Sequence, residues 1–318
     1  MKDTKTETPM ILCCGEALID MIPTPTVAGP EGFVPHVGGA VFNTAVALGR
    51  LGLPVAMLTG LSSDLFGRKL AGALQASNVA TDLVITSDRP TTLAFVQLRD
   101  GHATYDFHDE NSAGRMITPA DRPALPDRIT ALYFGGISLA VEPGAEAYAA
   151  RAARDGAARA VMIDPNIRPG FIRDAGAYRA RLARMLALAD IVKVSDEDLA
   201  WLIPGAGVDA EGLAALAAQG PKIVVVTRGA EGAIARLPSG QIVTAPAERA
   251  RVVDTVGAGD TFNAGLLARL SELGKLTKPA LAALDAEALI EALSFGARVA
   301  AVTVARAGAN PPWRRELT

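Results

Sequence analysis

The chain has 318 residues and a formal net charge of −3; 50% of its residues are hydrophobic and 20% are charged. This balance excludes an intrinsically disordered protein, and it lacks the basic surplus that nucleic acid or an anionic membrane would attract. The two cysteines are neighbours, so no disulfide framework is expected. The stretch before the first apolar run is too short and too acidic for a signal peptide, and no run approaches the roughly 18 apolar residues of a membrane span. A cytoplasmic protein is therefore expected.

Short apolar runs alternate with segments of helical spacing along most of the chain. Each run is ended by a glycine, an aspartate or another polar residue, as is typical of strands buried on both faces. The runs are Ile11–Ile19, Val55–Leu58, Ala131–Phe134, Val161–Ile163, Ile191–Val194 and Ile223–Val226, and the helical segments are 41–51, 64–76, 143–158, 174–189 and 209–218. This alternation predicts an α/β fold in which helices cover both faces of a mostly parallel sheet. Right-handed crossovers then place the carboxyl ends of the strands along one edge, where ligands bind. No linker divides the chain, so we expect one domain over 1–318.

Two stretches interrupt the alternation, at about 21–38 and 90–108. The first is rich in proline and glycine, and the second has β-rich runs on both sides of Asp100-Gly101, which predicts a hairpin. It is either an ordinary edge hairpin or, with the first stretch, a small β lid at the ligand edge. A small open sheet leaves one face and its edges uncovered, and pairing with the lid of a second copy would cover them. We therefore expect a homodimer through the lid; the alternative is a monomer whose lid folds over the bound ligand.

The segment Asp254–Thr261 carries the most informative pattern. Small residues at Gly257, Ala258 and Gly259 let the backbone approach a ligand, and the free N–H groups of a helix's first turn suit phosphate oxygens. Asp260 falls in that turn, where the helix dipole favours its ionised form. A carboxylate beside a phosphate cradle can take a proton from a hydroxyl group. The alternative is a capping aspartate after an ordinary turn. Neither a Walker loop nor a Gly-x-Gly-x-x-Gly fingerprint fits the sequence.

The chain resembles the ribokinase-like (PfkB) family of carbohydrate kinases. The resemblance is carried by Gly38–Ala45 with 48–52 and 60–67, and by Asp254–Asp260; within the family, Gly15–Asp20 and 105–115 are most similar to bacterial fructokinases. It implies a three-layer α/β/α sandwich with a small β lid, and ATP-dependent phosphorylation of the primary hydroxyl of a ketohexose, D-fructose first. The alternatives are a kinase for another sugar or sugar acid, such as ribose or 2-keto-3-deoxygluconate, and a non-catalytic sugar-binding regulator on the same fold.

The resemblance also implies roles for individual residues. Asp260 would be the base, with Gly257, Ala258 and Gly259 supplying the amides that hold the transferred phosphate. Asp20, at the end of the first strand, would bind sugar hydroxyls, and the lid side chains, including that of Arg99, would decide which sugar fits. The implied sugar contacts are Asp20, Gly39, Asn43, Phe95, Tyr105 and Arg168. The implied ATP contacts are Lys193, Ser195, Thr227, Gly229, Gly232 and Gly259, with Ala300–Val304 and Gly308-Ala309 lining adenine.

Metal ions are implied in two places. Mg²⁺ would accompany ATP, with its water ordered by Glu197 or Asp198; the sequence leaves open which carboxylate does so. Ser195 and Asp198 also fit a capping box at the start of a helix, and both roles are compatible. Asp254, with nearby carbonyl oxygens, is implied as a K⁺ site.

Overall fold

Nine strands form the central sheet of the computed structural model, which describes residues 8–99, 102–121 and 123–317. From one edge to the other they are β15 (Ile242–Ala245), β14 (Ala233–Arg236), β13 (Ile223–Thr227), β12 (Ile191–Ser195), β11 (Ala160–Asp164), β10 (Ile129–Gly135), β1 (Met10–Cys14), β4 (Val55–Leu58) and β6 (Val79–Ala80). Neighbours are parallel from β13 to β6, whereas the β13–β14 and β14–β15 pairs are antiparallel.

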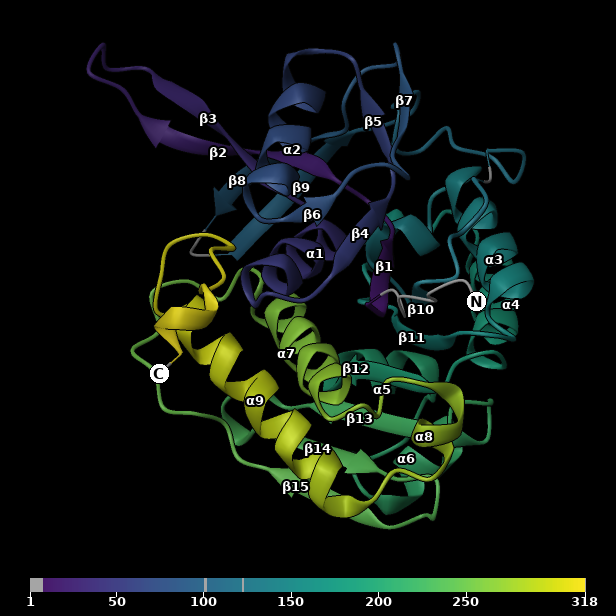
Figure 1. The fold of residues 1–318 in the computed structure, drawn as a ribbon. Helices are drawn as coiled ribbons and strands as arrows, with labels where there is room; N and C mark the ends of the chain where they lie inside the picture. The colour runs from purple at the N-terminus through teal and green to yellow at the C-terminus, as the bar shows by residue number, and fades with distance from the viewer. Residues whose placement is uncertain (1–7, 100–101, 122, 318) are drawn as a thin grey trace.

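Helices cover both faces of this sheet, which confirms the predicted three-layer α/β/α architecture (Figure 1). One face packs against α1 (Ala40–Arg50), α2 (Leu65–Ala76), α7 (Ala258–Glu272), α8 (Lys278–Ala282) and α9 (Ala286–Val304). The other packs against α3 (Gly144–Asp155), α4 (Ala175–Leu186), α5 (Asp196–Leu202) and α6 (Ala210–Ala217). Alternate side chains of one strand enter different cores: Cys13 and Tyr133 join the first, Leu12 and Phe134 the second. The central strands are mostly apolar because both faces are buried; Lys193 in β12 and the polar residues at the carboxyl ends are exceptions.

The helices begin where the sequence supplies a cap. Asp64, Asp174 and Asp285 each accept a hydrogen bond from a backbone N–H in the first turn of α2, α4 and α9. Short 3₁₀ turns follow three of the strands: η1 (Gly136–Leu139), η2 (Pro169–Phe171) and η3 (Gly229–Glu231). A further turn, η4 (Arg314–Glu316), follows α9. Among the residues that the structure describes, none of the helices is long and apolar enough to cross a membrane.

The apolar run Ile11–Ile19 is two strands, so its prediction as one was wrong. β1 ends at Cys14, and β2 (Leu18–Pro25) starts a different sheet. The chain turns at Gly15, where a Cβ atom would lie 2.4 Å from Val41 Cγ2. Burial of the side chains on both sides of the turn makes the run look continuous in the sequence.

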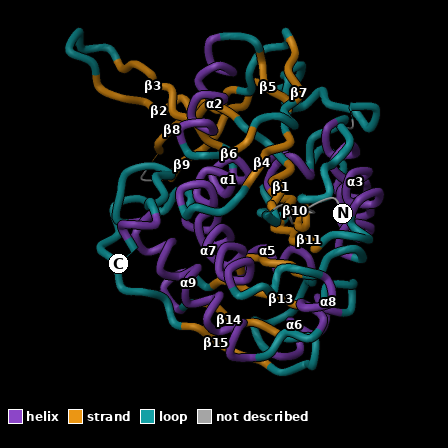
Figure 2. The backbone as a smooth tube through the Cα atoms, viewed as in Figure 1, coloured by secondary structure: helices purple, strands orange, loops and turns teal. Residues whose placement is uncertain are grey.

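The interrupting stretches meet in a four-stranded sheet, called the lid sheet below. Its order is β3 (Glu31–Gly38), β2, β8 (Leu93–Arg99) and β9 (His102–His108). The turn at Asp100-Gly101 lies outside the described residues, as do the side chains from 98 to 104. A further pair, β5 (Gly60–Ser62) and β7 (Ile85–Ser87), forms a separate two-stranded sheet. The β2–β3 hairpin extends beyond the sandwich (Figure 2), so the end of this hairpin is not covered by the helices.

Candidate active site

The carboxyl ends of the parallel strands bring polar residues to one edge of the sheet. β11 ends at Asp164, β12 at Ser195 and β13 at Thr227, and Ser195 pairs with Thr227 across the ladder. From β1 the chain first builds outward to β4 and β6, then returns through β10 and builds in the other direction. Ligands of open α/β sheets bind outside the strand ends at such a reversal. This edge is therefore the candidate active site.

The amino end of α7 points at this edge. The helix begins at Ala258, and its cap Gly257 has φ 78°, a conformation that favours glycine. A Cβ atom at Gly257 would also lie 2.7 Å from that of Ala309. The first bond within the helix runs from Thr261 N–H to the Gly257 carbonyl. The N–H groups of Gly259 and Asp260 precede it and are suited to an anion, whereas Ala258 N–H already bonds Thr255 at 3.2 Å.

Asp260 lies in this first turn and is only 8% exposed. One carboxylate oxygen accepts a hydrogen bond from Asn43 Nδ2 at 2.9 Å, and its backbone carbonyl accepts one from Thr44 Oγ1 at 3.1 Å. Burial raises the pKa of Asp260 to about 7, outweighing the Asn43 hydrogen bond that lowers it. Burial therefore opposes the helix dipole, which favours the ionised form. A carboxylate that titrates near neutral pH is suited to act as a general base.

A buried ion pair lies beside Asp260. Lys193 Nζ is 3.0 Å from Asp164 Oδ2, and both residues are at most 5% exposed. Asn263 Nδ2 donates to the same oxygen at 2.6 Å and to Tyr133 Oη at 3.0 Å. The resemblance implies Lys193 as an ATP contact but does not predict its ion pair with Asp164. The sequence signal for such a pair is a lysine within an apolar run, because a buried ammonium requires a buried anion on the same face of the sheet.

The sugar-side prediction for Asp20 needs a correction in position. Asp20 lies in the lid sheet, opposite His36 on β3 and Ala94 on β8, rather than at the end of the first strand. Burial raises the pKa of its carboxyl to about 6. Tyr105 is on the same face of the lid sheet, because it pairs with Val96, two residues beyond Ala94. Asp20 therefore remains available to a ligand, but from the lid rather than from the sandwich.

Three charged residues from separate parts of the chain, Asp20, Arg168 and Asp254, act on the hydroxyl of Tyr105. The pKa of its hydroxyl is raised, first by burial and then by the negative charge of Asp20, while the positive charge of Arg168 lowers it. Arg168 follows β11 and has an exposed side chain. Asp20 and Arg168 are thus close enough to Tyr105 for their charges to act on its hydroxyl.

Phe95 is separated from this group. It pairs with Asp106 on β9 and Met21 on β2, so it lies on the face of the lid sheet opposite to Asp20. Its ring packs edge-on against Phe33 and His108, with centroids 5.2 and 5.3 Å away. A sugar contact from Phe95 does not fit this arrangement, because successive strand residues face opposite sides.

The start of α1 forms the wall between the lid and α7. Gly39 caps the helix with φ 108°, and Asn43 lies one turn later, within reach of Asp260. The Glu16 carboxylate accepts hydrogen bonds from Ala40 N–H at 2.9 Å and Ser138 N–H at 3.2 Å. Burial raises the pKa of Glu16. This side chain joins the turn after β1 to the start of α1 and to η1.

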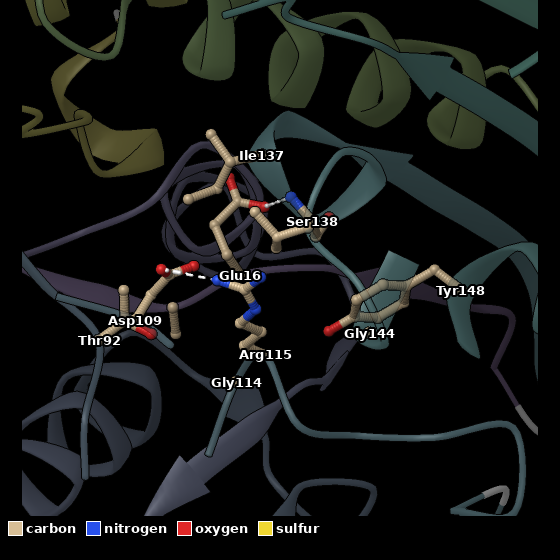
Figure 3. Close-up of a pocket in the computed structure, with 11 residues that line it drawn as sticks. Glu16, Thr92, Asp109, Gly114, Arg115, Ile137, Ser138, Gly144 and Tyr148 are labelled. Atoms are coloured by element: carbon tan, nitrogen blue, oxygen red, sulfur yellow. Dashed lines mark hydrogen bonds and ion pairs between the residues drawn. The ribbon is translucent and has the colours of Figure 1, made fainter. Parts of the chain in front are cut away.

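A small cavity behind Glu16 lies apart from Asp260. Figure 3 shows Glu16 with Ser138 on one side of it and the Arg115–Asp109 ion pair, 3.0 Å long, on the other. Arg115 also donates to the Glu142 carbonyl at 2.7 Å. These side chains bond to one another or to the backbone. They therefore support the wall formed by the start of α1, and the cavity between them is not the centre of the site.

The predicted ATP residues lie at the carboxyl edge. Gly229 and Gly232 have φ of 53° and 85° in the loop that joins the antiparallel strands β13 and β14. Ser195 Oγ accepts from Asp198 N–H at 3.0 Å, and Asp198 Oδ2 accepts from Ser195 N–H at 3.2 Å, so the capping box is formed. Gly259 contacts Lys193: a Cβ atom there would be 3.2 Å from Nζ.

The two candidate magnesium carboxylates are placed differently. Asp198 is buried and its pKa is raised, first by burial and then by the charge of Asp164, while Glu197 is exposed. Asp198 also accepts a hydrogen bond from Ile167 N–H at 2.9 Å. Among the described residues no three His, Cys, Asp or Glu side chains are grouped to hold a metal ion. Asp254 accepts from Val256 N–H at 3.0 Å and Gly308 N–H at 2.8 Å, which joins the turn before α7 to the segment after α9.

Comparisons with known proteins agree with this geometry. The family described as "pfkB family carbohydrate kinase" matches residues 8–315. A fructokinase from Rhizobium leguminosarum bv. trifolii is 54% identical over 281 residues, covering 88% of this chain and 85% of the relative. The solved fructokinase from Xylella fastidiosa with bound ATP has a TM-score of 0.87 at 31% identity, over 97% of both chains. A double-mutant fructokinase from Vibrio cholerae O395, bound to fructose, ADP and a potassium ion, has a TM-score of 0.82 at 27% identity, over 95% of this chain and 94% of that one.

Proposed function

The chain belongs to the pfkB family of carbohydrate kinases, and from that premise we propose that it transfers the terminal phosphoryl group of ATP to the primary hydroxyl of D-fructose. Asp260 carries the proposal, because its buried carboxyl has a pKa of about 7 and lies beside the free N–H groups of α7. The relative at 54% identity is a fructokinase, which supports fructose as the sugar.

Asp260 is proposed to take the hydroxyl proton as the sugar oxygen attacks the terminal phosphorus atom. The bond from that phosphorus to the bridging oxygen of ATP breaks, ADP leaves, and the proton passes from Asp260 to solvent in a later step. The first turn of α7, from Gly257 to Asp260, would stabilise the charge on the transferred group. Asn43 holds the carboxylate in place at 2.9 Å.

The sugar is proposed to lie between the lid sheet and the start of α1. A carboxylate such as Asp20 can accept hydrogen bonds from two adjacent hydroxyl groups. Gly39 would let the backbone approach the sugar. The proposed sugar contacts are Asp20, Gly39, Asn43, Tyr105 and Arg168; Phe95 is removed because it lies on the opposite face.

ATP is proposed to lie along the carboxyl ends of β12 and β13, with its terminal phosphate at α7. The proposed contacts are Lys193, Ser195, Thr227, Gly229, Gly232 and Gly259, with Ala300–Val304 and Gly308-Ala309 near the base. Closure of the lid over both substrates would exclude water and limit ATP hydrolysis.

Mg²⁺ fits the charge of this edge, because the carboxylates of Asp164, Asp198 and Asp260 outnumber the buried cations beside them among the described residues, where Lys193 is the one that acts on Asp198 and Asp260, and carboxylates are hard oxygen ligands. When bound with ATP, it would neutralise phosphate charge. Asp198, assisted by the exposed Glu197, is proposed to order its water. A K⁺ ion is proposed near Asp254; the Vibrio cholerae O395 enzyme was solved with a potassium ion.

The lid is proposed to form the interface of a homodimer. Phe33 and Val34 are 44% and 41% exposed, although both lie in β3, an edge strand of the lid sheet. Pairing of this open edge with the lid of a second copy would cover it. Cytoplasmic localisation belongs to the same proposal, because ATP is the phosphoryl donor.

The proposed function is tested by measuring ADP release with fructose, ribose, 2-keto-3-deoxygluconate and no sugar. We expect release to depend on Mg²⁺, to stop with EDTA, and to have its highest kcat/KM with fructose. A higher kcat/KM with another sugar would change the proposed substrate but would still support the kinase activity. Release that no sugar stimulates would favour a non-catalytic regulator and contradict the proposal.

A further inference from the structure

The active-site edge contains one buried ammonium group shared among several carboxylates. The positive charge of Lys193 lowers the pKa values of both Asp260 and Asp198, and its only hydrogen-bonded carboxylate among the described residues is that of Asp164. Lys193 is the third residue of β12, between apolar neighbours that are fully buried. Burying an ammonium group costs free energy, so one in that position needs a paired anion and a role for its charge.

Asp164 fixes where this ammonium lies. Its oxygens accept from Lys193 Nζ at 3.0 Å, Asn263 Nδ2 at 2.6 Å and the N–H group of Asn166 at 3.1 Å. Asp164 is 1% exposed, and these hydrogen bonds hold its carboxylate away from solvent. The ion pair links β11 and β12, and the Asn263 hydrogen bond joins it to α7.

That position is directly beside the anion-binding turn. A Cβ atom at Gly259 would be 3.2 Å from Lys193 Nζ, so the ammonium lies close to the backbone whose N–H groups are proposed to face the phosphate. A fixed charge that needs no rearrangement during the reaction is an effective way to stabilise a transition state.

We propose that Asp164 is a positioning residue, which holds the Lys193 ammonium against the first turn of α7 so that its charge stabilises the transferred phosphoryl group. The inference rests on the proposed function. It assigns no proton transfer to Asp164, which acts only through Lys193. It also explains the glycine at 259, since a side chain there would displace the ammonium.

The inference predicts how removing each charge changes the pH dependence. The groups that act on Asp260 are Asp164 from β11, Lys193 from β12, Glu16 from the turn after β1 and Asn43 from α1; Tyr133 from β10 is neutral near pH 7 because its pKa is raised by burial. Lys193 lowers the pKa of Asp260, so Lys193→Met should move the acid limb of kcat/KM to higher pH. Asp164 raises that pKa, so Asp164→Asn should move the limb to lower pH. General damage to the fold would not move the two limbs in opposite directions.

The test is a double-mutant cycle on purified full-length protein, with circular dichroism to confirm folding. We expect Lys193→Met to lower kcat by about 10²- to 10³-fold, as loss of a fixed transition-state charge does. If Asp164 acts only through Lys193, Asp164→Asn should lower kcat in the wild-type background but add no further loss in the Lys193→Met background. Lys222→Met is the matched control, since Lys222 pairs with buried Asp190 at 2.8 Å, at the opposite end of β12. It should leave kcat and the acid limb unchanged.

Independent losses that multiply in the double variant, or acid limbs that do not move apart, would overturn the inference. If Asp164→Asn alone does not fold, the double variant decides, because it removes both charges together: kcat below that of Lys193→Met contradicts the positioning role. If no sugar is turned over by the wild type, the proposed function fails separately. The same double-mutant cycle is then measured with the dissociation constant of ATP. Lys193→Met should weaken ATP binding, and adding Asp164→Asn to that variant should weaken it no further.

Discussion

The reaction edge of the sandwich and the lid sheet are built in opposite ways. Asp260, Asp164 and Lys193 are buried, and each is bonded to a residue of another element. Asp20 and Tyr105 are partly exposed, and within the part of the chain that the structure describes the carboxylate of Asp20 accepts no hydrogen bond. The difference indicates that the sandwich holds the groups proposed for phosphoryl transfer in place before substrates bind, while the lid leaves its polar groups available for the proposed sugar.

The largest effect should come from Asp260→Asn, which keeps the shape of the side chain but removes the proton acceptor. A positioned general base contributes typically 10²–10⁴-fold, so turnover should fall by at least that order. The binding of ATP and fructose, measured by calorimetry, should be largely kept. A variant with near-normal turnover would show that Asp260 is a structural cap.

The same variant should be more stable than the wild type at pH 8. The folded-state pKa of about 7 lies above the ordinary 3.8, so the stability associated with the protonated carboxyl is complete below pH 4 and is lost as the pH rises through 7. Asparagine avoids that loss, which is at most about 4 kcal/mol for this shift. Tm should therefore rise at pH 8 and change little at pH 4. An equal change at both pH values would contradict the burial account.

Gly259→Ala should separate stability from activity. Alanine improves helix formation, by about 0.5–1 kcal/mol in a helix interior, but its Cβ would crowd Lys193 Nζ at 3.2 Å. We expect a folded protein of similar or higher Tm with turnover reduced by about tenfold or more, since small misplacements in an active site are costly. The matched control is Gly72→Ala in α2, where an added Cβ meets nothing within 4 Å. Equal turnover in the two variants would argue against a rigid reaction edge.

Asp20→Ala should affect the sugar alone. A hydrogen bond to a charged group contributes about 1.5–3 kcal/mol, so the KM for fructose should rise by roughly 10- to 100-fold. The dissociation constant of ATP, measured without sugar, should stay nearly the same because Asp20 lies in the lid sheet. Equal weakening of both ligands would make Asp20 a structural residue and remove the distinction between the two regions.

The smallest effect on catalysis should come from charging the outer lid. Phe33→Asp or Val34→Asp should convert a dimer into monomers in sedimentation, with a rise in the KM for fructose smaller than that of Asp20→Ala. Ile290→Asp on α9, which is 39% exposed, is the matched control and should remain dimeric. A wild-type protein that sediments as a single species of 32.9 kDa at micromolar concentration would refute the dimer.

The sequence allowed the sandwich to be predicted well, because burial on both faces makes each central strand an apolar run. The same property misled at Ile11–Ile19, where two strands of different sheets are joined by a buried turn at Gly15 and Glu16. Local signals located Asp260 and the glycines before it, since a helix start is a short-range feature. The partnership of Asp164, Lys193 and Asn263 depends on three separate elements and could not be read from any one of them. The face on which Phe95 lies depends on strand register, which the sequence did not specify.

The most direct measurement of the central claim, that the sandwich edge holds a buried base ready for reaction, is the pH dependence of kcat/KM for fructose in the wild-type enzyme. The buried carboxyl of Asp260 predicts an acid limb with an apparent pKa of about 7, below which activity falls as Asp260 takes up a proton. An acid limb near the ordinary value of about 4 would contradict the account, because it would mean that no buried carboxylate takes the hydroxyl proton.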